Sequence, residues 1–189
     1  MKVCGFSHSR EVLIETFGMP LRNAMQRLQV RDRKTNEDVV EQLLAEYRLY
    51  NFANHDRLAA PFAGATEVLS ELRKRGYLIG VVTSKGRELA VRGLELCSLV
   101  GLIDSGVFLE DTDIHKPHPE PILAALGKLG ADPSSAAYVG DSRHDIAAAR
   151  AAGVRAVAAL WGPAPRTELE REQPDFVAGS LADLLEIFD

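Results

Sequence analysis

The sequence predicts an α/β protein with a mainly parallel sheet. Short apolar runs, of the length typical of buried strands, alternate along the chain with segments whose apolar residues recur at helical spacing. Glycine, or a residue with a hydroxyl or carboxyl group, directly follows several of these runs. Such residues are typical of the turn between a strand and the next helix. Because alternating strands and helices are connected by right-handed crossovers, neighbouring strands are expected to run parallel.

Length and composition limit the class of protein. The 189 residues suffice for one ordinary domain, or for a core with a small accessory unit. A net charge of −5 favours neither nucleic acid nor an anionic membrane as a partner. No apolar run reaches the roughly 18 residues of a membrane-spanning helix, and no secretory signal is recognisable. The only cysteines, Cys4 and Cys97, fit a reducing compartment, so a cytoplasmic location is expected.

Residues 1–60 are predicted to form a small helical unit. A first helix face carries apolar residues three and four positions apart, namely Leu21, Ala24, Met25 and Leu28. A second amphipathic stripe runs through residues 39–47, and nothing in this part of the chain alternates like a strand. The segment 17–21, which contains glycine and proline, is expected to separate two helices.

Residues 61–189 are predicted to form the sheet and its covering helices. Apolar runs predict strands at residues 77–82, 107–109, 136–139, 154–158 and 175–177. Helical patterns between and around them predict helices at residues 68–76, 87–97, 119–129, 146–152 and 181–188. The carboxyl ends of these strands would meet at one edge of the sheet, where open α/β proteins bind their ligands.

Side chains suited to phosphate follow the first two predicted strands. Thr83 and Ser84 open the helix after the first strand, and a helix N-terminus offers free N–H groups to an anion. Lys116 follows the second strand, on a segment stiffened by prolines, and could neutralise a phosphoryl group. Taken singly, a hydroxyl at a helix start is usually a cap, and a lone lysine is usually a solvated surface charge.

Two carboxylates follow the third strand. Asp141 and Asp145 lie four residues apart, at the turn into an alanine-rich helix. Carboxylate oxygens suit Mg²⁺, which takes one or two of them and keeps water or phosphate oxygens besides. The alternative is that Asp141 caps the helix and that Asp145 lies on its solvated face.

In this order along the chain, the hydroxyl, the lysine and the paired acids resemble the haloacid dehalogenase (HAD) superfamily. Thr83 matches its second motif, Lys116 its third, and residues 140–145 its fourth, so that the resemblance extends over about residues 11–188. Segments 17–21 and 50–56 are similar to the phosphoglycolate phosphatase-like branch, in particular to its PpaX-type pyrophosphatases. The resemblance implies a Rossmann-like core over residues 61–189 and a helical cap over residues 1–60.

The resemblance also implies roles for individual residues. Thr83 and Lys116 would be catalytic, and together with Ser84 they would bind the phosphoryl oxygens of a small phosphoester or of pyrophosphate. Asp141 and Asp145 would hold Mg²⁺, directly or through water. His118 stands where the family usually has aspartate after the Lys-Pro pair, and we interpret it as a changed helix cap.

One motif of the family has no counterpart in this sequence. The first motif, Asp-x-Asp-Gly-Thr, ends an N-terminal strand at the centre of the sheet, but the first aspartate here is Asp32, in a charged segment. We therefore expect both the central strand and the aspartate nucleophile, which carries the phosphoryl group, to be missing. By resemblance, the sequence predicts a Mg²⁺-dependent phosphohydrolase. Because the nucleophile is missing, we expect the chain as it stands to be inactive. The alternative is a non-catalytic HAD-like protein that binds phosphate or a protein partner.

Overall fold

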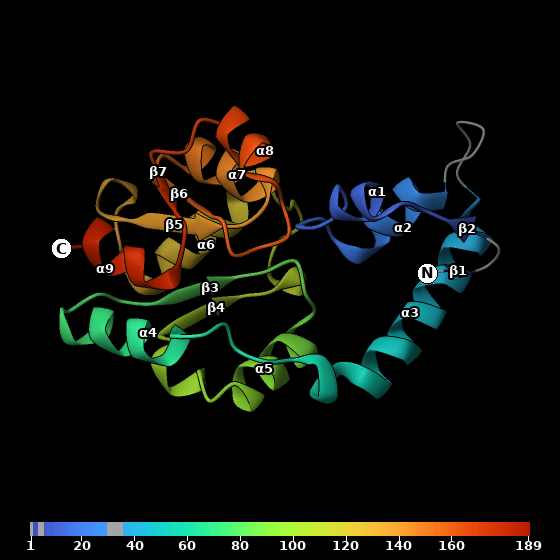
Figure 1. Cartoon of the computed structure of the whole chain (residues 1–189), viewed down its shortest axis with the longest axis horizontal. Coiled ribbons are helices and arrows are strands. Elements are labelled where there is room, and N and C mark those ends of the chain that lie inside the picture. Colours follow the sequence, from blue (N-terminus) through green and yellow to red (C-terminus); the bar gives the residue numbers. More distant parts are fainter. Residues whose placement is uncertain (1, 4–5, 30–35) are drawn as a thin grey trace.

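The computed structural model describes residues 2–3, 6–29 and 36–189, which form two parts (Figure 1). The N-terminal part consists of β1 (Lys2–Val3), β2 (Phe6–Ser7), α1 (Arg10–Ile14), α2 (Leu21–Gln29) and α3 (Glu37–Leu58). The second part begins with α4 (Ala65–Lys74), β3 (Gly80–Val82), α5 (Arg87–Leu96), β4 (Ser105–Val107) and α6 (Glu120–Leu129). It ends with β5 (Ala137–Gly140), α7 (Arg143–Ala152), β6 (Arg155–Ala159), α8 (Arg166–Arg171), β7 (Phe176–Ala178) and α9 (Leu184–Ile187).

The N-terminal part has a small core of its own between α2 and α3. Its buried residues are Met25, Val40, Leu43 and Leu44. The long helix α3 then continues toward α5 of the second part, where Asp56 forms an ion pair with Arg92 at 2.6 Å (Figure 1). Residues 1–60 were predicted to be helical, but β1 and β2 pair as antiparallel strands. Strands of two residues are too short to show an alternating pattern. Cys4 and Asp32 lie outside the described residues.

All strand pairs of the second part are parallel, as the alternating pattern predicted. β3 pairs with β4, and β6 lies between β5 and β7. On one side, α6 and α7 pack on the strands through a core that includes Ile122 and Ile146, and on the other, α4 and α9 pack through Val68, Leu72 and Leu184. The α/β fold class is thus confirmed. Helix α8 was not predicted, since six polar-rich residues carry only one buried side chain, Leu169.

The parallel strands of the second part form two separate sheets among the described residues. β3 and β5 face one another, but no strand is hydrogen-bonded between them (Figure 1). Across this space, the Tyr138 hydroxyl of β5 donates to the carbonyl of Val82 of β3, at 3.1 Å. Val81, Val82, Tyr138 and Val139, on the facing strands, are only half-buried, whereas residues 156–159 of β6 are buried. This space corresponds to the position at which the resemblance implied a missing central strand.

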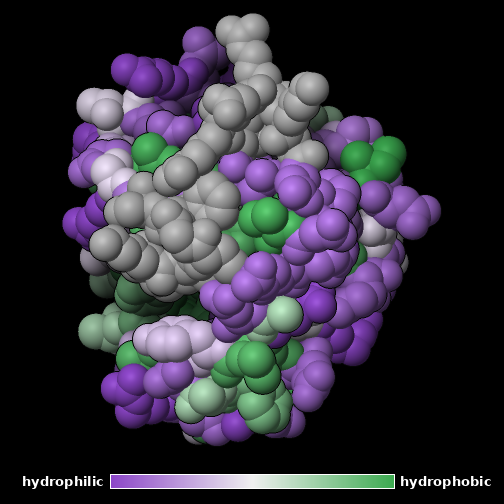
Figure 2. All heavy atoms as spheres, turned by 90° about the vertical axis from the view of Figure 1, so that its right-hand side faces the viewer, coloured by the Kyte–Doolittle hydropathy of each residue, from purple (hydrophilic) through white to green (hydrophobic). Residues whose placement is uncertain are grey.

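The face formed by the N-terminal part is mostly hydrophilic, with hydrophobic residues in separate patches (Figure 2). Among the exposed hydrophobic side chains of the chain are Leu49, Tyr50, Phe52 and Leu58 of α3. None of the described helices is long and apolar enough to cross a membrane.

Candidate phosphate and metal site

The predicted site residues all lie where strands end. Thr83 follows β3, and Asp141 follows β5 and precedes the ten-residue helix α7, which contains Asp145. Lys116 lies on the segment between β4 and α6, before a cis peptide bond to Pro117. His118 accepts a hydrogen bond from the Glu120 backbone through Nδ1, at 3.3 Å, which agrees with its interpretation as a helix cap. Parallel topology therefore brings these distant segments to one edge of the fold.

Lys116 and Asp145 form a buried ion pair. The Lys116 ammonium lies 2.6 Å from Asp145 Oδ1, and both side chains are more than nine-tenths buried. Although burial works against the charged form of Lys116, the neighbouring Tyr138 and Asp145 raise its pKa well above the ordinary value. Burial also raises the pKa of Tyr138, with a further contribution from Asp145. At neutral pH Lys116 is a cation and Tyr138 keeps its proton.

Asp145 is held in place by both of its oxygens. Oδ1 accepts from Lys116 and faces the Tyr138 hydroxyl at 3.3 Å. Oδ2 accepts from the Ser142 backbone N–H at 3.1 Å and from its hydroxyl at 2.6 Å, so the two residues form a capping box at the start of α7. The alternative interpretation of Asp145 as a solvated residue is wrong, because only 4% of it is exposed.

Asp141 is the more accessible carboxylate of the pair. Burial raises its pKa, and the neighbouring charge of Asp145 raises it further. A cation would relieve this repulsion, and carboxylate oxygens suit Mg²⁺, so these two residues fit the metal site that the sequence predicts. The described residues include no cluster of three or more His, Cys, Asp or Glu side chains that could hold a metal. The remaining ligands would therefore be water, backbone or phosphate oxygens.

The hydroxyl of Thr83 accepts a hydrogen bond from its own loop. Its Oγ1 accepts a hydrogen bond from the Lys85 backbone N–H at 3.1 Å, which leaves the hydroxyl proton available for an anion. The start of α5 is less open than the sequence suggested. The Glu110 carboxylate accepts from the Arg87 backbone N–H at 3.0 Å and thereby caps this helix. A carboxylate therefore already occupies part of the start of α5.

Ser84 is engaged by the N-terminal part of the chain. Its hydroxyl donates to the carbonyl of Gly18 at 2.8 Å. Gly18 has a left-handed backbone with φ of 83°, and a Cβ there would lie 2.4 Å from Ser142 Oγ. The segment 17–21, predicted only as a break between helices, therefore packs directly on two strand-end segments of the site.

Three contributors to this site were not predicted. Tyr138 was predicted only as part of a strand, Gly18 only as part of the break at 17–21, and Gly162 was not singled out. Gly162 follows β6, and a Cβ at this position would lie 2.2 Å from Asp141 Cβ and 2.4 Å from its Oδ2. The sequence signal at this place is the Gly162-Pro163 pair after a strand, which predicts a turn. It does not predict which residues the turn contacts.

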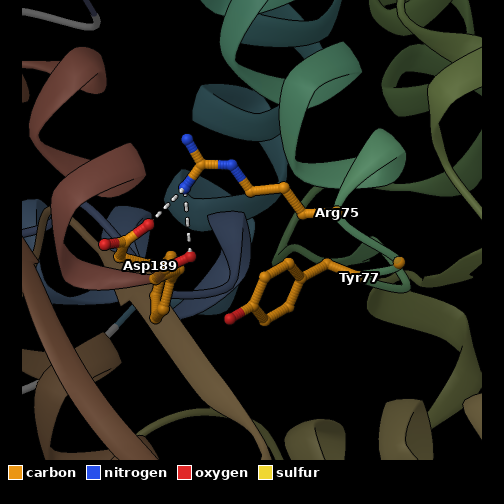
Figure 3. A pocket seen from close by; sticks show the side chains of 5 residues that line it. Arg75, Tyr77 and Asp189 are labelled. Atoms are coloured by element: carbon orange, nitrogen blue, oxygen red, sulfur yellow. Dashed lines mark hydrogen bonds and ion pairs between the residues drawn. The ribbon is translucent and has the colours of Figure 1, made fainter.

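A separate pocket lies at the opposite edge of the sheet, before β3 begins. It is lined by Arg75, Gly76, Tyr77, Phe188 and Asp189 (Figure 3). Arg75 donates to the carbonyls of Leu185 and Phe188 at 2.7 and 3.3 Å, and lies 3.7 Å from the Asp189 carboxylate. The Tyr77 ring contacts that of Phe188, with centroids 5.8 Å apart. These contacts attach the end of the chain to α4, and the pocket holds none of the predicted site residues.

Replacing Gly162 by alanine is expected to weaken Mg²⁺ binding by about tenfold or more, because the new methyl group would displace Asp141. Isothermal titration calorimetry with MgCl₂ measures the effect. Gly127→Ala is the matched control, since a Cβ at this position in α6 meets nothing within 4 Å. Equal Mg²⁺ affinities of Gly162→Ala and the unaltered chain would contradict the assignment of Asp141 as a ligand.

Comparison with known proteins agrees with this geometry. The family model of haloacid dehalogenase-like hydrolases matches residues 1–159. A pyrophosphatase PpaX from Bacillus cereus is 40% identical over 154 residues, which are 82% of this chain and 71% of that protein. A structure from Haemophilus somnus, described as a predicted phosphoglycolate phosphatase, superposes with a TM-score of 0.85 at 25% identity, covering 97% of this chain and 84% of that one. A hydrolase from Pseudomonas syringae superposes with a TM-score of 0.83 at 26% identity, covering 95% and 82% of the two chains.

These similarities extend over the strand ends that carry Thr83, Lys116, Asp141 and Asp145. The chain therefore belongs to the haloacid dehalogenase-like hydrolase family, in its phosphoglycolate phosphatase- and PpaX-like branch.

Proposed function

We propose that this chain binds the phosphoryl group of a small phosphoester or of pyrophosphate at the strand-end site. The observation that carries the proposal is the buried Lys116–Asp145 pair, which Tyr138 links to Val82, the residue before Thr83. A buried cation with a hydroxyl donor is a suitable receptor for an anion, because charge-assisted hydrogen bonds are strong where water is excluded. Pyrophosphate and phosphoglycolate are the substrates that the names of the similar proteins suggest.

Mg²⁺ is the proposed cofactor. Asp141 would hold it, and Asp145 would support it while keeping Lys116 charged. When bound, the ion would neutralise charge on the phosphoryl oxygens of the substrate. The residues of the chain itself bind and orient: Thr83 and Lys116 hold the phosphoryl group, and Ser84 attaches the segment around Gly18 to the edge of the site.

The proposed activity of the chain as it stands is binding without turnover. Covalent phosphoryl transfer needs a carboxylate free to attack in line, but both oxygens of Asp145 are occupied and Asp141 is assigned to metal. The superfamily's full first motif, Asp-x-Asp-Gly-Thr, is absent from the given sequence, and the space between β3 and β5 contains no described strand that could carry it. We propose that residues 1–60 act as the cap of the site, and that the protein works in the cytoplasm.

Titration with inorganic phosphate, with and without MgCl₂, tests this function. We expect saturable phosphate binding that Mg²⁺ strengthens, and a loss of about tenfold or more in Thr83→Val, which removes one charge-assisted hydrogen bond. Thr66→Val is the matched control, because Thr66 is an exposed residue of α4. Phosphate affinity that is the same in Thr83→Val and in the unaltered chain would contradict the proposed site.

A further inference from the structure

The environment of Tyr138 assigns this residue a role that no family motif covers. Its hydroxyl accepts a hydrogen bond from the Lys116 ammonium at 3.1 Å. The single proton of the hydroxyl faces the carbonyl of Val82 at 3.1 Å and Asp145 Oδ1 at 3.3 Å. Because a lysine ammonium can only donate, the phenol oxygen is the acceptor in its bond with Lys116, and its own proton is directed to the other two partners.

These bonds use most of the hydrogen-bonding capacity of Lys116. A lysine ammonium has three N–H donors. One of them is directed to Asp145 Oδ1 at 2.6 Å and a second to Tyr138. With two donors directed to buried side chains, rotation of the ammonium is restricted, and the third donor has one remaining direction. Because only 7% of the Lys116 side chain is exposed, an anion can bind the ammonium only along the direction of this third donor.

The same hydroxyl connects Lys116 to the segment that carries Thr83. Val82 immediately precedes Thr83, and its carbonyl is the shorter of the two contacts of the Tyr138 proton. Tyr138 on β5 therefore links the end of β3 to the lysine that follows β4, across the space between the two sheets. Among the described residues, this is the one hydrogen bond that links β5 to β3.

We propose that Tyr138 is a positioning residue, which holds the Lys116 ammonium at a fixed place relative to Thr83 so that both donors act on one phosphoryl group. The inference rests on the proposed function, since it concerns the same site. Tyr138 itself need not touch the phosphate. Its aromatic ring packs against the core cluster of α6 and α7, so replacing only the hydroxyl keeps the packing.

Tyr138→Phe is the decisive variant, measured by phosphate calorimetry and by NMR of the ¹⁵N-labelled lysine ammonium groups. We expect phosphate affinity to fall about 3- to 10-fold, as for one lost hydrogen bond that acts indirectly. We also expect the Lys116 ammonium signal to shift and its protons to exchange faster with water. If Tyr138 had a purely structural role, the variant would change the unfolding midpoint but neither the phosphate affinity nor the Lys116 ammonium signal. Tyr77→Phe is the control, because Tyr77 lies at the opposite edge of the sheet.

A double-mutant cycle separates positioning from other effects. In a Lys116→Met background, Tyr138→Phe is expected to cause no further loss of phosphate affinity, because it acts through the lysine. A loss that persists in this background overturns the inference, as does an unchanged Lys116 ammonium signal in Tyr138→Phe itself. If the unaltered chain binds no phosphate, the proposed function fails, and the ammonium signal still decides whether Tyr138 holds Lys116.

Discussion

Asp145→Ala is expected to lower the free energy of unfolding by about 3–5 kcal/mol, because it leaves the ammonium of Lys116 buried without its partner. The substitution also removes the capping box with Ser142 at the start of α7, which adds to the loss. Urea denaturation followed by circular dichroism measures the change. A loss below about 1 kcal/mol, the range of an exposed ion pair, would contradict the buried pair.

Two further variants separate the ion pair from other effects. The double variant Lys116→Met/Asp145→Leu replaces both charges by apolar groups and is expected to recover much of the lost stability without regaining phosphate affinity. Asp141→Asn is expected to stabilise the fold slightly at neutral pH. The pKa of Asp141 is raised in the folded chain, so its ionised form opposes folding at pH values above that pKa. The same variant should lose Mg²⁺ binding.

The unaltered chain is expected to show no Mg²⁺-dependent hydrolysis of p-nitrophenyl phosphate above background. Placing a strand-forming segment that ends in Asp-x-Asp ahead of Met1 should raise the rate by about a thousandfold or more, because it supplies the in-line nucleophile. The segment would pair with the free edges of β3 and β5, so thermal unfolding should also become more cooperative. Release of p-nitrophenol and differential scanning calorimetry measure the two effects.

The matched control is the same segment ending in Asn-x-Asn. It should keep the gain in cooperativity, because it fills the same space between the sheets, yet it should show no turnover. Robust hydrolysis by the unextended chain, abolished in Asp141→Ala, would mean that the chain already contains a nucleophile. Cooperative unfolding of the unextended chain as a monomer would mean that the space between β3 and β5 does not weaken the fold.

The fold class, the order of the strands in the chain and most helices of the second part could be predicted from the sequence. Apolar runs at residues 136–139 and 154–158 lie within one or two residues of β5 and β6, because buried strands need apolar side chains on both faces. The two-residue strands β1 and β2 and the short helix α8 were not predictable, since so few residues carry no periodic signal.

The sequence by itself determined which side chains stand at strand ends, because this depends only on local patterns around Thr83, Lys116, Asp141 and Asp145. The tertiary structure alone decided what each of them touches. Packing buries Asp145 against Lys116, directs Ser84 toward Gly18, and places Gly162 against Asp141. Tyr138 is separated from Val82 by 56 positions in the chain, and only the juxtaposition of β5 and β3 brings its hydroxyl to that carbonyl. Such contacts depend on how distant segments pack, and the spacing of residues along one segment contains no information about them.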